Sequence, residues 1–396
     1  MAVPSAESLS REGRLPEAIE VYQKALRRQP GNEGIELSLA DLYRRVRNDE
    51  AARTILQTAR RQHPRSIPVL RAIGILEMDT LDYDASVAAF RAALDIAPSS
   101  LELKNLLATA YTRKGDAPAA LRELDAVLSH NPADGLARFL RAGIYADAGE
   151  NERALLDAEK VVTAKPEYEP GRTLYAKILV RLAKCQRAAE VLRPAERQRA
   201  LDADALFLLS NAYDCAGQKD LASQVRAEFE TISRAEHETS ENRVQSLHLV
   251  EQANQLAMQN KLSEAQDLLR QALEKNPGNA FAYSQLAKIY FSMRDAQQAR
   301  AFIDKALEIQ PYQPDFLFVR GVIEAGEKNF EAALASFNAV TLINPKEADA
   351  YYEIGKIWMR KNDRSRALAA FRKASELAPE DADYRQALSS ASEAHP

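Results

Sequence analysis

Prolines recur along this chain at a fixed spacing of 34 residues, in two series. The prolines that belong to these series are Pro30, Pro64, Pro98, Pro132 and Pro166, then Pro277, Pro311, Pro345 and Pro379. So regular a spacing indicates an internal repeat, and periods of about 20 to 50 residues are typical of solenoid proteins. A chain of 396 residues is also longer than one hydrophobic core usually serves, whereas an array of repeats grows in one dimension.

Within each period, small and large apolar residues alternate at fixed distances before the proline. The small residue stands 24 positions before it, as Ala6, Ala40, Gly74, Ala108, Ala142, Ala253, Ala287, Gly321 or Gly355. A large residue usually stands eight positions before it, as Tyr22, Leu56, Phe90, Leu124, Leu269, Ile303, Phe337 or Phe371, with Ala158 as the exception. Small residues let two helix axes approach closely, and proline cannot continue a helix. Each period therefore predicts a hairpin of two packed helices that ends at its proline.

This pattern resembles the tetratricopeptide repeat, a family with a 34-residue period. One good match is formed by Leu107, Ala108, Tyr111, Ala120, Leu124, Val127 and Pro132, and another by Leu286, Ala287, Tyr290, Ala299, Ile303, Ala306 and Pro311. The resemblance implies an all-α fold, a right-handed superhelical solenoid of antiparallel helix pairs. About eleven repeats and a C-terminal capping helix are expected.

Shifts in the register divide the chain into four parts. Residues 1–233 form a block of about seven repeats, and residues 246–380 form a block of four. Between them, 234–245 is polar and lacks the pattern, which predicts an insertion or linker. Ser240 in this stretch is expected to cap the next helix. Residues 381–396 are expected to form the capping helix and a tail, with a polar outer face that ends the array.

No motif of an enzyme or of a cofactor site occurs in the sequence. The phosphate-binding, dinucleotide-binding, serine-hydrolase and zinc-protease motifs are all missing, and the five histidines lie in distant regions. We therefore expect no catalytic residues, no cofactor and no metal site. A formal net charge of −4 argues against a nucleic-acid partner. No apolar run reaches the ~20 residues needed to span a bilayer.

The two cysteines, Cys185 and Cys215, lie 30 residues apart in adjacent repeats. Two free, partly buried thiols are the expected state, since unpaired cysteine often behaves as a small apolar residue. A disulfide between neighbouring hairpins is the alternative, and it requires that the Cα atoms approach within ~7 Å.

The family resemblance implies that the first helix of each repeat lines a concave face on which peptides bind. In the N-terminal block this face is polar and rather basic, with Arg71, Asn105, Thr109, Arg113, Lys177, Arg181 and Asn211. In the C-terminal block it combines aromatic residues with cations, as Asn254, Phe281, Lys288, Phe291, Phe318, Tyr352, Lys356 and Arg360. Exposed aromatic residues often anchor a partner, and Lys288, Lys356 and Arg360 are expected to meet a carboxylate. Alternatively, individual aromatic residues pack against the next hairpin as core.

Two binding modes known for the family do not match this sequence. The carboxylate clamp of co-chaperones would require lysines, asparagines and an arginine at positions that here hold Val250, Asn254, Gln285, Asp315 and Val319. Only Asn254 fits. The asparagine ladder of sugar-transferring relatives has no counterpart either.

The sequence thus predicts a non-catalytic scaffold that binds a partner protein or peptide in its concave groove. Three alternatives remain open: a bacterial cell-envelope scaffold for assembly or exopolysaccharide secretion, a regulatory repeat domain of a larger enzyme, and self-association through the end repeats. Abundant alanine and an excess of arginine over lysine favour a bacterial source. The expected compartment is the cytoplasm if the chain is native as given, or the periplasm if a targeting segment was removed.

Overall fold

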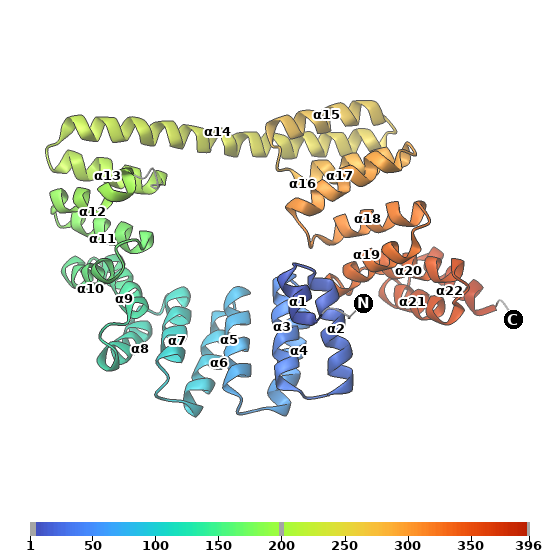
Figure 1. Cartoon of the computed structure of the whole chain (residues 1–396), viewed down its shortest axis with the longest axis horizontal. Coiled ribbons are helices and arrows are strands. Elements are labelled where there is room, and N and C mark those ends of the chain that lie inside the picture. Colours follow the sequence, from blue (N-terminus) through green and yellow to red (C-terminus); the bar gives the residue numbers. More distant parts are fainter. Residues whose placement is uncertain (1–4, 198–201, 394–396) are drawn as a thin grey trace. The chain divides into compact units, whose positions relative to one another are not determined.

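The computed structural model describes residues 5–197 and 202–393, and every regular element in these ranges is a helix (Figure 1). Two compact units divide the chain. Unit 1 combines Met1–Ala52 with Thr239–Pro396, and unit 2 is Arg53–Glu238. Two helices contain the boundaries between the units, α4 (Asp49–Gln62) and α14 (Lys219–Met258). The prediction of an all-α fold is confirmed.

Unit 2 is a succession of helical hairpins in which each helix packs on the next in the chain. Its helices are α5 (Ile67–Asp79), α6 (Tyr83–Ile96), α7 (Leu101–Lys114), α8 (Ala117–His130), α9 (Gly135–Asp147), α10 (Asn151–Ala164), α11 (Glu169–Arg181), α12 (Cys185–Arg197) and α13 (Ala203–Cys215). Side-chain caps explain where many of them begin. Ser66 accepts a hydrogen bond from the Val69 amide at 3.2 Å, and Asp82 accepts one from the Ala85 amide at 3.0 Å.

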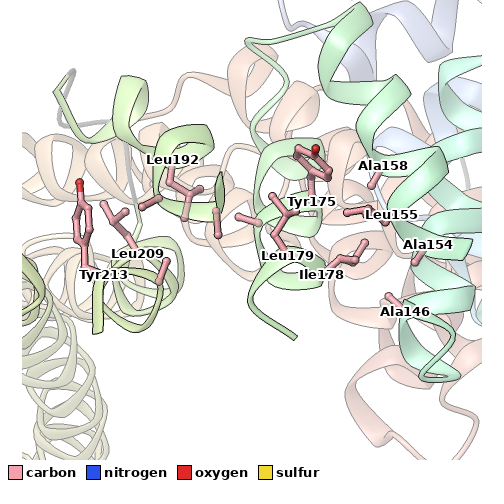
Figure 2. Packing of buried hydrophobic residues seen from close by; sticks show 14 of the residues in the cluster. Ala146, Ala154, Leu155, Ala158, Tyr175, Ile178, Leu179, Leu192, Leu209 and Tyr213 are labelled. Carbon is pink, nitrogen blue, oxygen red and sulfur yellow. The ribbon is translucent and has the colours of Figure 1, made fainter. Parts of the chain in front are cut away.

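An apolar core joins neighbouring hairpins of unit 2, as Figure 2 shows for helices α9 to α13. Tyr175, Leu179 and Leu209 are buried in it, and the start of α14 adds Ala222 and Val225. Each hairpin buries its apolar face only by stacking on its neighbours, which is the usual source of stability in a solenoid. Two ion pairs of the buried Asp157 also join α10 to α9: Asp157 on α10 accepts hydrogen bonds from Arg138 at 2.5 Å and from Arg141 at 2.6 Å, both on α9.

Unit 1 contains the two ends of the chain. Its N-terminal helices are α1 (Ala6–Arg11), α2 (Leu15–Arg28) and α3 (Glu33–Arg45). The end of α14 is followed by α15 (Leu262–Lys275), α16 (Ala280–Ser292), α17 (Ala296–Ile309), α18 (Pro314–Gly326), α19 (Phe330–Ile343), α20 (Ala348–Arg360), α21 (Arg364–Leu377) and α22 (Ala382–Glu393).

Hydrogen bonds within unit 1 join residues almost 300 positions apart. The buried amide of Asn48 donates to the Leu342 carbonyl at 2.6 Å, and the Tyr312 hydroxyl donates to the Gly13 carbonyl. Helix α2 also packs against α19. No periodic pattern reports such contacts, because they join repeats that are far apart in the array.

Helix α14 corrects the expectation that Ser240 caps the start of a helix, and it makes the stretch 234–245 helical. The helix runs without interruption from Lys219 to Met258, so Ser240 lies in its middle and caps nothing. The stretch contains no proline or glycine and includes three glutamates and two arginines, so an existing helix extends through it at little cost. The start of α14 closes the seventh hairpin and its end opens the eighth. Because α14 belongs to two hairpins, the 22 helices of the described ranges form eleven hairpins and leave α22 as the cap.

The cysteines correct a second expectation, because Cys185 and Cys215 form a disulfide with a Cα–Cα distance of 5.7 Å. Cys185 begins α12 and Cys215 ends α13. Helix α12 ends one hairpin and α13 begins the next, and the two helices pack against each other in antiparallel order, so the start of α12 lies beside the end of α13. The separation lies in the usual range for disulfides, and the prediction of two free thiols is wrong.

Candidate partner-binding groove

Two neighbouring cavities lie on the first helices of the C-terminal hairpins in unit 1 (α14, α16, α18 and α20 in Figure 1). The first, here called the aromatic pocket, has a volume of about 360 Å³. Its lining is Lys288, Phe291, Pro314, Asp315, Phe318, Val319, Val322, Ile323, Glu347 and Asp349. The second, here called the amide pocket, has about 590 Å³. Its lining is Asn254, Ala257, Met258, Asn260, Leu262, Gln285, Lys288, Ile289 and Ser292. Lys288 belongs to both.

The wall of the aromatic pocket follows from helical spacing on α18. Three residues follow Asp315 at distances of three, four and seven positions, namely Phe318, Val319 and Val322. This spacing places all four on one face of the helix. Phe318 is half-buried, and its ring packs edge-to-face on Phe337 with centroids 5.3 Å apart. It therefore supports the core and faces the pocket at once.

Phe291 on α16 forms the opposite wall, where a glycine makes room for it. A Cβ atom at Gly326 would lie 2.7 Å from the Phe291 ring, closer than van der Waals contact allows. The ring is half-buried, and its remaining surface lines the pocket. The two aromatic walls thus come from successive hairpins, which only stacking brings together.

The charges around the aromatic pocket are mostly negative. Asp315, Glu347 and Asp349 contribute carboxylates, whereas Lys288 contributes the one ammonium group of the lining. Burial raises the pKa of Glu347, and the charges of Asp349 and Asp315 raise it further, while the Asn344 amide opposes the shift through a hydrogen bond of 2.9 Å. The carboxylates therefore repel one another in a place where water only partly screens them.

Four of the predicted C-terminal site residues line these cavities: Asn254, Lys288, Phe291 and Phe318. Phe281 does not, and its ring packs edge-to-face on Phe316 at 5.2 Å.

Three other predicted residues of this block are engaged outside the two cavities. Lys356 donates to Glu353 at 2.6 Å and lies over the ring of Tyr352, which packs in turn on Phe371. Arg360 lies over the ring of Phe330, with its guanidinium carbon 6.0 Å from the centroid. Of the three cations expected to meet a carboxylate of the partner, Lys288 lines these two cavities, whereas Lys356 and Arg360 do not.

The predicted residues of the N-terminal block do not meet in one cavity. Arg71 forms an ion pair with Glu102 at 3.0 Å, and Arg181 donates to the Ala146 carbonyl at 2.5 Å. Asn105 is buried and donates to Asp134 at 3.3 Å, and Thr109 donates to the Asn105 carbonyl.

The remaining three residues are spread over α7, α11 and α13: Arg113 and Lys177 are exposed and Asn211 is half-buried. A cavity of about 530 Å³ in unit 2 lies elsewhere, at the hairpin connections. Its lining includes Leu136, Phe139, Lys165 and Tyr168.

Sequence reasoning missed the carboxylates of the aromatic pocket. A signal for two of them existed, because Asp315 and Asp349 are 34 residues apart and occupy the second position of α18 and of α20. Asp315 was considered only as a position where the carboxylate clamp fails. Glu347, just before α20, carries no such periodic signal, and its place in the pocket depends on how the hairpins stack.

Two further site types were sought in the described ranges. No group of three or more histidine, cysteine, aspartate or glutamate side chains there is arranged to hold a metal ion. No helix within the same ranges is long and apolar enough to cross a bilayer.

Comparison with known protein families gives matches along most of the chain. Two family models, both described as tetratricopeptide repeat, match it. The first matches residues 9–74, 256–317 and 324–391, and the second matches 71–123 and 105–169.

Among curated proteins, the chain is similar to cellulose synthase operon protein C of Pseudomonas fluorescens (26% identity over 84% of this chain) and of Xanthomonas axonopodis (25% over 70%). It spans 27% and 17% of the length of these two relatives. It is also similar to a tetratricopeptide repeat and J domain-containing co-chaperone of Fusarium oxysporum, with 24% identity over 76% of this chain and 58% of that protein. A solved structure, the Cut9–Hcn1 complex of APC/C, aligns over 98% of this chain and 95% of that chain with a TM-score of 0.36 and 12% identity.

Proposed function

Because the chain belongs to the tetratricopeptide repeat family, we propose that it is a non-catalytic scaffold whose aromatic and amide pockets hold a segment of a partner protein. The observation that carries this proposal is the aromatic pocket itself. Its walls, Phe291 and Phe318, come from successive hairpins and leave aromatic surface open between them. Partly exposed aromatic side chains in a concave site are typical anchors of protein interfaces.

The composition of the two pockets suits an extended peptide. The aromatic pocket offers apolar surface for a side chain, and its volume lies near the lower end of the range for ligand pockets, about 300–1,000 Å³. The amide pocket offers Asn254, Gln285 and Ser292, whose groups both donate and accept hydrogen bonds. A backbone segment has the complementary groups, one donor and one acceptor for each residue.

The test compares two alanine substitutions on the same helix. Phe291→Ala removes a wall of the aromatic pocket, whereas Phe281→Ala removes an exposed aromatic ring that packs on Phe316 outside both pockets. The full chain serves as bait in a lysate of its source, and captured proteins are quantified by mass spectrometry. We expect Phe291→Ala to lose the partner and Phe281→Ala to retain it. Equal retention by both variants, with unchanged circular dichroism, would place the binding site elsewhere.

A second candidate function is a scaffold in the bacterial cell envelope that takes part in exopolysaccharide secretion. Two observations favour it. The Cys185–Cys215 disulfide fits an oxidising compartment such as the periplasm, since cytosolic thiols are usually kept reduced. Two of the relatives are cellulose synthase operon proteins.

The redox state of the protein in its own cells tests this second candidate. Intact cells are quenched with acid, free thiols are alkylated, and peptides that contain Cys185 and Cys215 are measured by mass spectrometry. A fully bonded pair in a periplasmic fraction is expected. Two alkylated thiols in a cytoplasmic fraction would argue against the envelope and leave the proposed scaffold role intact.

A further inference from the structure

We propose that the aromatic pocket accepts a cationic side chain, an arginine or a lysine flanked by aliphatic residues, from a basic segment of the partner. This inference rests on the proposed function and deepens it by naming the chemistry of the occupant. It also reverses the charge expected from the sequence, where Lys288, Lys356 and Arg360 pointed to an acidic partner.

The floor of the pocket suits the stem of such a side chain. Val319 and Ile323 are buried beneath it, and Phe291, Phe318 and Val322 surround it with apolar surface. Arginine and lysine carry three or four methylene groups that pack on apolar surface while the charged head stays near water. Burial of the stem and of a neighbouring aliphatic residue removes apolar surface from water, which favours binding.

The carboxylates lie where the charged head would emerge. Asp315 comes from the first turn of α18, Glu347 precedes α20, and Asp349 lies in its first turn. The hydrogen bonds found for these acids come from neutral donors: the Tyr384 hydroxyl donates to Asp349, and the Asn344 amide donates to Glu347. Burial, followed by the bond to Asp349, raises the pKa of Tyr384, so its hydroxyl stays neutral.

Within the described ranges, none of these three carboxylates forms an ion pair with a lysine or arginine of the chain. The role of an acid at a helix N-terminus accounts for part of this arrangement, since Asp315 and Asp349 stabilise the first turns of their helices. It does not account for Glu347, whose side chain makes no capping hydrogen bond. A cation from outside would lower the repulsion among all three groups at once. A guanidinium group can also bond a carboxylate through two N–H groups.

Lys288 makes the charge of the site differ between the aromatic pocket and the amide pocket. It lies between the two pockets and is the one cation of their linings. A second cation beside the first would meet this ammonium group, whereas a backbone carbonyl or an acidic residue would be attracted to it. The ligand expected from this charge pattern has its basic residue in the aromatic pocket and neutral or acidic residues over the amide pocket.

The test uses three labelled peptides that differ at one residue. The probes are acetyl-Gly-Leu-Arg-Leu-Gly-amide, the same peptide with citrulline in place of arginine, and the same peptide with glutamate. Citrulline keeps the length and shape of arginine and removes its charge. Binding to the full chain is measured by fluorescence anisotropy at low salt. We expect the arginine peptide to bind at least ten times more tightly than either of the others.

Two double variants of equal charge change then locate the effect. Asp315→Asn with Glu347→Gln removes two carboxylates of the pocket. Glu264→Gln with Asp304→Asn removes two exposed carboxylates on α15 and α17, outside both pockets. The first variant is expected to weaken the arginine peptide about tenfold, while the second leaves it within about twofold. Thermal unfolding of both variants checks that the fold is retained.

The outcomes separate this inference from the proposed function. Equal binding of the arginine and citrulline peptides, a preference for glutamate, or no binding of any peptide would overturn the cationic occupant. Equal weakening by both double variants would do the same, because it would show an effect of net charge alone. If the native partner still depends on Phe291 in those cases, the scaffold proposal stands without this inference.

Discussion

Gly74 lies directly against the ring of Phe90, so that a Cβ atom built on the glycine would be 2.5 Å from the Phe90 Cε1 atom. The glycine is on the first helix of a hairpin and the phenylalanine is on the second. Gly321 with Phe337 repeats this relationship in unit 1. Where the larger residue is leucine or isoleucine, the smaller one is alanine. The size of one side chain is therefore matched to the size of its partner 16 positions later.

This matching predicts that a glycine-to-alanine change, which usually stabilises a helix, lowers the stability of the protein here. Gly74→Ala would ordinarily stabilise a helix by about 1 kcal/mol, but here the added methyl group collides with Phe90. We expect a net loss of about 1–3 kcal/mol through overpacking. Adding Phe90→Leu should recover part of the loss, because it recreates the alanine–leucine pair found at Ala108 and Leu124. Urea unfolding of the two single variants and the double variant measures the coupling, and additive effects would refute the matching.

The buried carboxylate of Asp157 provides a second prediction. Asp157→Ala leaves the guanidinium groups of Arg138 and Arg141 without their buried partner, and the expected loss is about 3–5 kcal/mol. Asp125→Ala is the matched control, since this exposed aspartate also pairs with Arg141, at 2.5 Å. The control should cost less than about 1 kcal/mol. Chemical denaturation measures both, and similar losses would show that burial does not matter here.

The disulfide predicts a redox-dependent stability of unit 2. The bond joins residues 30 positions apart. Closing a loop of that size lowers the entropy of the unfolded chain and thereby stabilises the folded state by about 3–4 kcal/mol. Cys185→Ser with Cys215→Ser should lower the unfolding temperature, and a reducing agent should lower that of the native chain to a similar value. The reducing agent should leave the double variant unchanged. A native chain that is insensitive to reduction would contradict the bond.

The raised pKa of Glu347 predicts how binding depends on pH. In the folded chain this carboxyl keeps its proton at a higher pH than the ordinary 4.5 of an exposed group. Between the unfolded and the folded pKa the folded state binds more protons, so this group's contribution to stability falls as pH rises through that interval. The charged groups around it are Asp315 on α18, Asp349 on α20 and Lys288 on α16, with neutral Tyr384 on α22.

A cationic ligand favours the ionised form of Glu347 and thus offsets the free-energy cost of ionising this carboxyl in the pocket. The arginine peptide should therefore bind more tightly as pH rises above 4.5, with binding strength levelling off once Glu347 is fully ionised. Anisotropy titrations over a pH series measure the effect. Glu347→Gln should flatten the profile, and a variant that keeps the native profile would assign the dependence to another group.

Residues within one period allowed much of the fold to be predicted from sequence. Gly74 and Phe90, or Ala108 and Leu124, meet inside a single hairpin, so their sizes and spacing report the helix pair directly. The continuity of α14 was missed because a helix that bridges two hairpins needs no apolar stripe in its middle, and the polar stretch around Ser240 resembled a linker. The disulfide was missed because only the packing of α12 on α13 brings Cys185 beside Cys215.

The sequence by itself determined the hairpin, its period and its core, since these depend on the sizes of side chains less than one repeat apart. Only the tertiary structure decided which aromatic residues line a pocket and which pack on a neighbouring ring. Phe291 lines the aromatic pocket, whereas Phe281 packs on Phe316. The tertiary structure also decided that Asp315, Glu347 and Asp349 surround the same cavity. The physical reason is that the rotation of each hairpin on the next, set by packing, brings together side chains that lie a whole repeat apart.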